Sequence, residues 1–348
     1  MAGEGATGFS DIDRQAFATA TGVLAAVYIA LLMGLDEPYW AALSVMIIAN
    51  VDRDALFTKG VLRVLGTFIG VIGGYYIGQW AEGYNLMQLA LVTIAAAVGT
   101  YGRQRSAYGY AWFYGGLTFA LVMLYTMTQP AQLYGFAHYR CFEIVIGVVC
   151  GTLSSWALGP RAGELHARLK AQAAATTALN AEHQSLIAGL GAFTIIIVWS
   201  LFDLPQLPQV LISSLIVVDS DPLATRHRGF QRILGCILGG AAALVVILID
   251  AVHVWWWASM LFLGVFSFAR IHLGKSSQAY IGTQCAIAYL VTLVSASPPD
   301  SLAPPIERLV GIVIGVSLMT VLVWAFNPPA KADSSAETPT DTPAKKPA

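Results

Sequence analysis

The sequence predicts an all-α integral membrane protein of about twelve transmembrane helices, arranged as two parallel six-helix repeats. Of the 348 residues, 57% are hydrophobic and only 11% are charged, whereas soluble domains carry roughly 25% charged residues. The chain holds twelve apolar runs, and a helix of about 20 apolar residues crosses a bilayer. One motif also occurs twice, which indicates an internal duplication.

The repeated motif starts at a basic residue and continues into an apolar helix. Residues 59–70 read KGVLRVLGTFIG and residues 228–239 read RGFQRILGCILG, with five of twelve positions identical. Two acidic segments precede each copy, 36–38 and 52–54 in the first half and 203–205 and 219–221 in the second, at an offset of 167 residues. A Glu-x3-Gly-x3-Gly pattern follows each copy, at 143–151 and 307–315. The constant order predicts two homologous halves.

Six apolar runs in each half define the expected helices. They span residues 16–34, 39–51, 61–80, 87–101, 108–128 and 141–158 in the first half, and 187–202, 207–218, 230–250, 254–269, 279–296 and 307–326 in the second. The runs 39–51 and 207–218 are too short to cross about 30 Å of hydrocarbon. Short segments at matching positions of two repeats indicate a transporter's binding site.

Lysine and arginine residues predict the orientation. If the N-terminus is cytoplasmic, seventeen of the nineteen lie on the inner side, where short cationic loops are retained. Both halves then begin and end inside, which makes the repeats parallel. The expected divisions are an N-terminal tail at 1–13, the first repeat at 14–158, a cytoplasmic helical linker at 159–185, the second repeat at 186–326 and a disordered, cytoplasmic C-terminal tail at 327–348.

The repeated motif supplies the cationic candidates for substrate binding. Arg63, Gly66 and Gly70 share one helical face, and small residues four apart let helices approach closely in a membrane. Arg63 therefore points toward packed protein and suits an anionic substrate. The alternative is a positive-inside anchor paired with a nearby aspartate. The other members of this set are Lys59 one turn earlier, and Arg228, Arg232, Gly235 and Gly239 in the second half.

Aspartates supply the first candidates for proton coupling. Asp52 and Asp219 end the two short runs. Either these runs stop inside the bilayer, which would place the two aspartates near membrane depth with Arg63 and Arg232 as partners, or flanking residues complete the spans. A purely structural ion pair is the alternative. Two residues further on, Asp54 and Asp221 are predicted to cap the helices that follow, because aspartate accepts from the free N–H groups of a first helical turn.

Two glutamates are the second set of coupling candidates. Glu143 shares a helical face with Gly147 and Gly151, and Glu307 shares one with Gly311 and Gly315. An ionisable group on the packing face of a spanning helix indicates a function. A low dielectric favours its neutral form, so a proton can come and go.

The run 108–128 is rich in aromatic residues, including Tyr110 and Phe113. They are candidates for contacting a flat organic acid, and anchoring at the membrane interface is the alternative. The four cysteines lie in apolar runs and indicate neither disulfides nor a metal site. No cofactor is indicated, and no basic patch with interleaved aromatic residues indicates nucleic acid as a partner.

The segment Pro38-Tyr39-Trp40-Ala41, the motif at 59–70 and the Glu143 face together resemble the fusaric acid resistance (FUSC) family, which is grouped with the aromatic acid exporters. The resemblance covers residues 14–326 and makes Lys59, Arg63, Gly66 and Gly70 the family's motif positions. It implies an inner-membrane exporter of aromatic or other organic acids. Some members work with a periplasmic adaptor. Many carry large cytoplasmic domains where this chain has a short linker, which leaves adaptor pairing open.

The sequence thus predicts a transporter, not an enzyme, that exports organic anions, in particular aromatic carboxylic acids, driven by the proton motive force. Its expected partners are the lipid bilayer, a small organic anion, and either a periplasmic adaptor or a second copy of the chain. A passive organic-anion channel is the first alternative and would need no titrating carboxylate. An integral-membrane prenyltransferase is the second, because Asp-containing loops can hold magnesium diphosphate, although the Asp-x-Asp spacing is narrower than such enzymes use.

Overall fold

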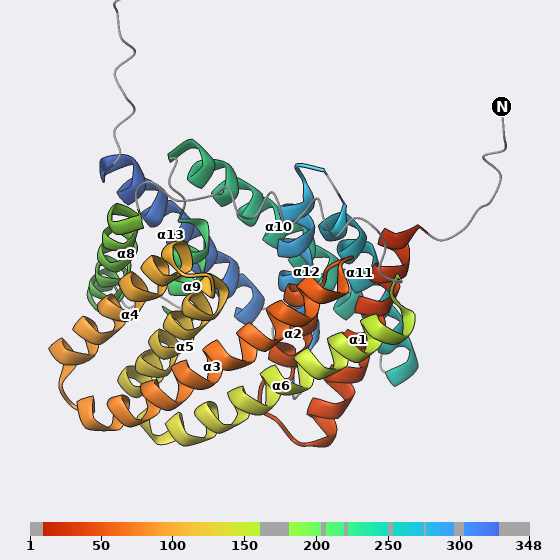
Figure 1. Ribbon diagram of the computed structural model, residues 1–348, viewed down its shortest axis with the longest axis horizontal. Coiled ribbons are helices and arrows are strands. Elements are labelled where there is room, and N and C mark those ends of the chain that lie inside the picture. Colours follow the sequence, from red (N-terminus) through yellow and green to blue (C-terminus); the bar gives the residue numbers. More distant parts are fainter. Residues whose placement is uncertain are drawn as a thin grey trace, which may run out of the picture.

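The computed structural model describes residues 10–160, 181–202, 207–218, 222–249, 253–274, 276–295 and 303–326, and these residues form twelve α-helices without a β-strand (Figure 1). The first half contains α1 (Asp11–Leu32), α2 (Tyr39–Ile48), α3 (Arg53–Ala81), α4 (Asn85–Arg105), α5 (Gly109–Thr128), the 3-10 turn η1 (Pro130–Gln132) and α6 (Leu133–Leu158). The second half contains α8 (Ala181–Phe202), α9 (Leu207–Val217), α10 (Pro222–Leu248), α11 (Val254–Leu273), α12 (Ala279–Leu293) and α13 (Ala303–Phe326).

Nine of the described helices are long and apolar enough to cross a membrane, and three apolar helices are shorter: α2, α9 and α12. The prediction of an all-α membrane protein is therefore confirmed, as is the shortness of the runs that begin at Tyr39 and Leu207. The third short helix was not predicted, because the apolar run 279–296 continues beyond the helix end at Leu293. Most of the predicted linker and all of the C-terminal tail lie outside the described residues.

Local signals explain where several helices begin and end. Ser10 caps α1, and its hydroxyl and the Asp13 carboxylate form a reciprocal capping box. Gly34 follows α1 with a φ of 65°, a conformation that glycine adopts without steric cost. Pro38 precedes the first residue of α2, a position where proline's missing N–H removes no helical hydrogen bond.

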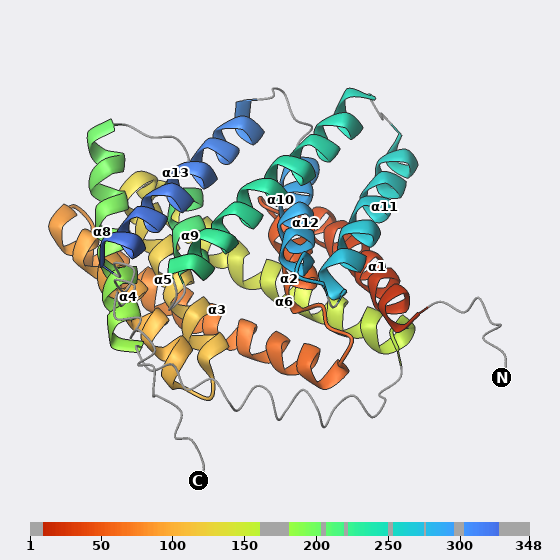
Figure 2. The same cartoon turned by 90° about the horizontal axis from the view of Figure 1, so that it is seen from above.

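The two halves pack against one another in a repeated way. Helix α4 lies beside α8 at one end of the molecule, and α1 lies beside α11 at the other (Figures 1 and 2). Between them, α2 contacts α12 and α5 contacts α9. The short helices α2 and α9 therefore both lie where the halves meet.

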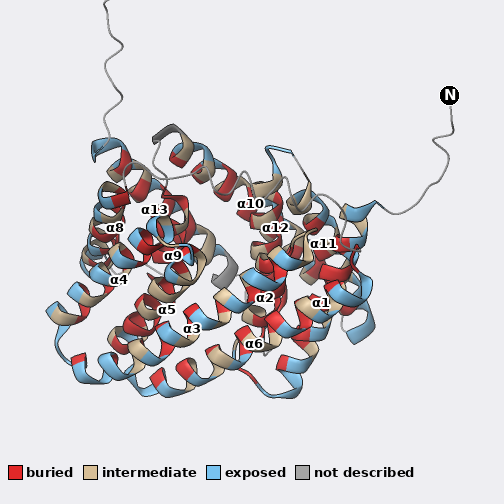
Figure 3. Ribbon diagram, viewed as in Figure 1, coloured by how far each residue is buried: buried red, intermediate tan, exposed pale blue. Residues whose placement is uncertain are grey.

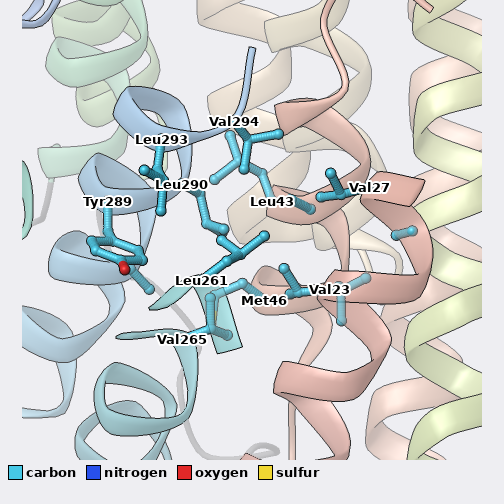
Figure 4. Packing of buried hydrophobic residues seen from close by; sticks show 14 of the residues in the cluster. Val23, Val27, Leu43, Met46, Leu261, Val265, Tyr289, Leu290, Leu293 and Val294 are labelled. Carbon is cyan, nitrogen blue, oxygen red and sulfur yellow. The ribbon is translucent and has the colours of Figure 1, made fainter. Parts of the chain in front are cut away.

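Two large apolar clusters fill these contacts. One joins α1 and α2 to α11 and α12, where Val23 and Met46 meet Leu261 and Leu290 (Figure 4). The other joins α4 and α5 to α8 and α9. Buried residues face neighbouring helices, whereas many outer faces are exposed (Figure 3). The outer faces carry large apolar side chains, such as Ile69 at 70% and Trp255 at 84% exposure, as expected for surfaces that lipid covers.

Glycines allow the closest helix contacts. Gly66 and Gly70 of α3 lie against the backbone of α5, at Ala111 and Gly115. Gly235 and Gly239 of α10 lie against the backbone of α12 in the same way, at Ile281 and Cys285. These are four of the eight glycines for which a packing role is predicted from their spacing, the others being Gly147, Gly151, Gly311 and Gly315. The first four glycines let α3, which carries Arg63, pack closely against α5, and let α10, which carries Arg232, pack closely against α12.

Candidate functional site

Arg63 of α3 is buried, with only 2% of the residue exposed. Its Nε–H donates to the Ser44 hydroxyl of α2 over 3.3 Å. Its guanidinium group lies over the Tyr114 ring of α5, with 4.3 Å between Cζ and the ring centroid. Nη1 makes no well-directed hydrogen bond among the described residues. The Tyr110 hydroxyl lies close enough to interact with Arg63 and Tyr114, although its geometry toward both is poor for a hydrogen bond. A buried cation with an unused donor is the arrangement that an anion would complete.

Arg232 of α10 is the corresponding cation of the second half and is also 2% exposed. Its Nη1–H donates to Oε1 of Gln284 over 2.6 Å, and its Nη2–H donates to the Ser213 hydroxyl over 3.1 Å. Ser213 precedes Arg232 by 19 residues, as Ser44 precedes Arg63. The two halves thus build similar surroundings for their arginines, with Gln284 near the place that Tyr114 takes in the first half.

An acidic cluster lies at the start of α2. The backbone N–H of Glu37 donates to Oε1 of the buried Glu143 over 3.1 Å. The Trp40 indole N–H donates to Oε2 of Glu37 over 2.7 Å. The Arg140 guanidinium lies over the Trp40 ring, 3.3 Å from Cζ to the centroid. Both carboxylates are thereby tied to the helix that also carries Ser44.

A cavity of about 530 Å³ opens beside this cluster. Glu37 and Glu143 form part of its wall, so the buried carboxylate borders a space large enough for water. The remaining lining residues are Asp36, Tyr125, Ala131, Gln132, Gly135, Phe136 and Tyr139.

Among the residues that the structure describes, the second half does not repeat the Glu143 cluster, and one predicted match is wrong. Gly147 lies against the Ala41 carbonyl, whereas Gly315 lies against the carbonyl of Val210, which follows Ala41 by 169 residues. Gly315 therefore corresponds to Gly147. Counting back four residues, Gly311 takes the place of Glu143. Glu307 lies one turn further away, and it is exposed instead of lying on the packing face. Gly151 packs against Val45, also on α2.

Asp52 proves to be the N-cap of α3, a role predicted for Asp54. Its carboxylate accepts from the backbone N–H groups of Asp54 and Ala55, because Asp52 has extended backbone angles and the helix begins at Arg53. Arg63 lies eleven residues along, roughly 16 Å at about 1.5 Å per residue. The predicted pairing of Asp52 with Arg63 is therefore wrong. Asp219 and Asp221 lie outside the described residues.

Substitutions at Asp52 separate capping from proton coupling. Asp52→Ala should lower the free energy of unfolding by about 0.5–2 kcal/mol, whereas Asp52→Asn should change it by only a few tenths, because asparagine caps as well as aspartate. Thermal unfolding in detergent measures this. Asp52→Asn cannot titrate, so loss of pH-driven transport in this stable variant would assign a proton to Asp52. Unchanged transport would restrict Asp52 to capping.

Three of the remaining predicted site residues lie near Arg63 or Arg232, whereas Phe113 lies beside Arg103 of α4. Lys59 and Arg228 are partly buried one turn before the two arginines. Tyr110 lies near Arg63, and the buried Phe113 ring lies under Arg103, 4.7 Å from Cζ. Sequence reasoning missed Ser44 and Glu37 as site residues, and it placed Gln284 on a substrate route instead of beside Arg232. The sequence does contain a signal for Ser44 and its counterpart Ser213, because the two serines occupy matching positions in the two short apolar runs.

The described helices and their lipid-facing exteriors define a multi-pass α-helical membrane protein. The chain belongs to the fusaric acid resistance protein family, which it matches over residues 14–192, and residues 190–326 match the related fusaric acid resistance protein-like family. The resemblance carried by the motifs is therefore confirmed.

Curated relatives are similar to the chain over part of its length. A p-hydroxybenzoic acid efflux pump subunit AaeB from Escherichia coli O1:K1 / APEC is 30% identical over 159 residues, which cover 42% of this chain and 24% of the relative. The same figures apply to proteins of that name from Escherichia coli O139:H28 (strain E24377A / ETEC) and Shigella boydii serotype 18 (strain CDC 3083-94 / BS512). The similarity thus spans about a quarter of these relatives (24%). No solved structure matches the chain.

Proposed function

We propose that this chain exports organic anions, in particular aromatic carboxylic acids, across the inner membrane. The observation that carries the proposal is the buried Arg63 guanidinium, whose Nη1 has no acceptor among the described residues. A buried charge is stable only when it is paired, and a carboxylate accepts two parallel hydrogen bonds from a guanidinium group. The p-hydroxybenzoic acid efflux pump subunits among the relatives support this substrate class.

The aromatic surroundings of Arg63 favour a substrate with a ring. Tyr110 and Tyr114 are in contact, with their ring centroids 4.7 Å apart, and Arg63 lies over Tyr114. A substrate carboxylate bound to Arg63 would hold its ring against these tyrosines, where offset stacking and edge contacts stabilise aromatic pairs. The Tyr110 hydroxyl, which lies beside Arg63 and Tyr114, could turn to donate to a carboxylate or to a ring substituent. This is the aromatic-acid site that the proposal requires.

The proposed driving force is a proton gradient acting through Glu143. Glu143 accepts a hydrogen bond from Glu37, immediately before α2, and Ser44 of the same helix holds Arg63. Protonation of Glu143 would weaken its hold on α2, because a neutral carboxyl is a poorer acceptor than a carboxylate. Helix α2 thus provides a physical link between a proton site and an anion site. The groups that act electrostatically on Glu143 are Arg140, Glu37 and Asp36.

Flux from proteoliposomes tests the proposed function. Vesicles are loaded with p-hydroxybenzoate, and efflux is followed with and without an acidic outside. Export that the pH gradient accelerates is the expected result. Efflux that follows only the anion gradient and the membrane potential would instead identify a passive anion channel. Absence of p-hydroxybenzoate flux in either condition would exclude an aromatic acid exporter.

Substituting Glu143 tests the coupling. Glu143→Gln should make efflux independent of the pH gradient while efflux down the anion gradient continues, because glutamine keeps a hydrogen-bond acceptor but does not titrate. The control is Glu307→Gln, since Glu307 is exposed and should affect coupling less. Initial efflux rates at several outside pH values measure both variants. Equal loss of coupling in the two would contradict the central role of Glu143.

A further inference from the structure

The two buried arginines differ in the part of the guanidinium group that remains available. Arg232 uses both Nη groups, one on Gln284 and one on Ser213, and only its Nε lacks a partner in the described part of the chain. Arg63 is held in the opposite way, because Nε contacts Ser44 while Nη1 has no partner there. The guanidinium group of Arg232 is therefore held through its two terminal Nη groups, whereas that of Arg63 is held through Nε.

This difference decides which arginine can bind a carboxylate through the end of its fork. End-on binding uses one N–H from each Nη group. At Arg232 the Gln284 amide oxygen already occupies this edge at 2.6 Å, and Gln284 is itself 1% exposed. A substrate would have to displace a buried hydrogen bond to a charged group. Such a bond stabilises by roughly 1.5–3 kcal/mol. At Arg63 no amide oxygen holds Nη1, and the neighbouring Tyr110 hydroxyl makes no well-directed hydrogen bond to it.

We propose that the chain has one open anion site, at Arg63, and that Gln284 closes the corresponding site at Arg232 by serving as its internal ligand. The inference rests on the proposed function and makes it more specific: two similar halves provide a single substrate site. The Arg63 site would take an aromatic carboxylate, whereas Arg232 would have a structural role. Gln284 is then the residue that determines the number of sites.

Two further differences between the halves agree with one site. Tyr114 lies under Arg63 as a ring against which a substrate can stack, whereas an amide takes the corresponding place at Arg232. The carboxyl of Glu143 is linked through Glu37 to the helix that holds Arg63, and Gly311 takes its place in the second half. A buried tyrosine lies beside each arginine, Tyr110 beside Arg63 and Tyr280 beside Arg232. The second tyrosine, Tyr114, and the linked carboxyl of Glu143 accompany Arg63, whose Nη1 makes no well-directed hydrogen bond among the described residues.

Chemical modification tests the inference without relying on transport. Phenylglyoxal, an arginine reagent, is applied to the full chain in detergent, and peptide mass spectrometry gives the rate for each arginine. Arg63 should react about tenfold or more faster than Arg232, since reaction at Arg232 must break the Gln284 bond. Equal rates, faster reaction of Arg232, or no reaction at either residue would overturn the proposal.

Variants of Gln284 provide the matched comparison. Gln284→Leu removes the amide oxygen at similar volume and should raise the reactivity of Arg232 toward that of Arg63. Gln284→Glu keeps an acceptor and should leave Arg232 protected. If both substitutions leave Arg232 unreactive, Gln284 is not the closing residue. The wild-type comparison remains decisive if either variant fails to fold.

Protection by p-hydroxybenzoate separates this inference from the proposed function. Selective slowing of the Arg63 reaction by p-hydroxybenzoate would support both. Selective reaction of Arg63 without protection would leave the single open site standing and would remove p-hydroxybenzoate as its ligand. Protection of both arginines would show two substrate sites and overturn the inference while supporting aromatic acid binding.

Discussion

Replacing Arg63 with glutamine should abolish export of aromatic carboxylates. Glutamine removes the charge and the two-pronged donor that a carboxylate would contact, and truncating one partner of a buried charge pair costs roughly 2–5 kcal/mol. The rate of p-hydroxybenzoate efflux should therefore fall by at least about thirtyfold. Initial efflux rates from proteoliposomes containing equal amounts of folded protein measure the effect.

Two control variants make this result specific. Arg63→Lys keeps the charge but loses the planar fork, so its rate should lie between those of the wild type and Arg63→Gln. Arg232→Gln removes a buried cation at the corresponding position. It tests whether the loss of any buried arginine is enough to abolish export. If one open site exists, Arg232→Gln should reduce export much less than Arg63→Gln once folding is matched. The reverse order would contradict the assignment of Arg63 as the anion site.

The helix face that carries Arg63, Gly66 and Gly70 could be predicted from the sequence, because it depends on one helix alone. Arg63, Gly66 and Gly70 lie on one face of any α-helix, and glycines four residues apart mark a close helix contact. The structure places these glycines against α5, and Arg63 is buried beside them. The two short helices could also be predicted, since they follow from the length of the apolar runs and the charges that end them.

The surroundings of the arginines could not be predicted in the same way, because they depend on contacts between helices. Ser44 and Tyr114 reach Arg63 from α2 and α5, and nothing within α3 specifies these neighbours. Gln284 reaches Arg232 from α12 for the same reason. Such pairings follow from packing, which a single sequence does not display.

The wrong match of Glu307 with Glu143 has a similar origin. The shared Glu-x3-Gly-x3-Gly pattern aligns Glu307 with Glu143. The correct alignment of the two helices, however, is set by their contacts with another helix. Gly147 and Gly315 each meet the carbonyl of a short helix, at Ala41 and Val210. This contact shifts the correspondence by one helical turn and places Glu307 outside the packed face.

Adding a methyl group at Gly70 should destabilise the protein, whereas the same change at Gly73 should not. A Cβ at Gly70 would lie within 2.9 Å of the Thr118 Cβ and 3.0 Å of the Phe119 backbone nitrogen, in addition to meeting the Gly115 carbonyl. Backbone atoms cannot turn aside, so α3 and α5 would have to separate. Such overpacking typically costs about 1–3 kcal/mol.

Gly73 is a matched control because it lies on the same helix three residues further on. A Cβ there would meet only the Phe119 ring, with its nearest atom at 3.6 Å, an ordinary van der Waals contact. Both substitutions gain the same helix propensity of alanine over glycine, so the difference between Gly70→Ala and Gly73→Ala reports the helix contact. Thermal unfolding in detergent should give a lower midpoint for Gly70→Ala alone. Equal midpoints would mean that α3 and α5 do not approach as closely as described, and the placement of Tyr114 under Arg63 would lose its support.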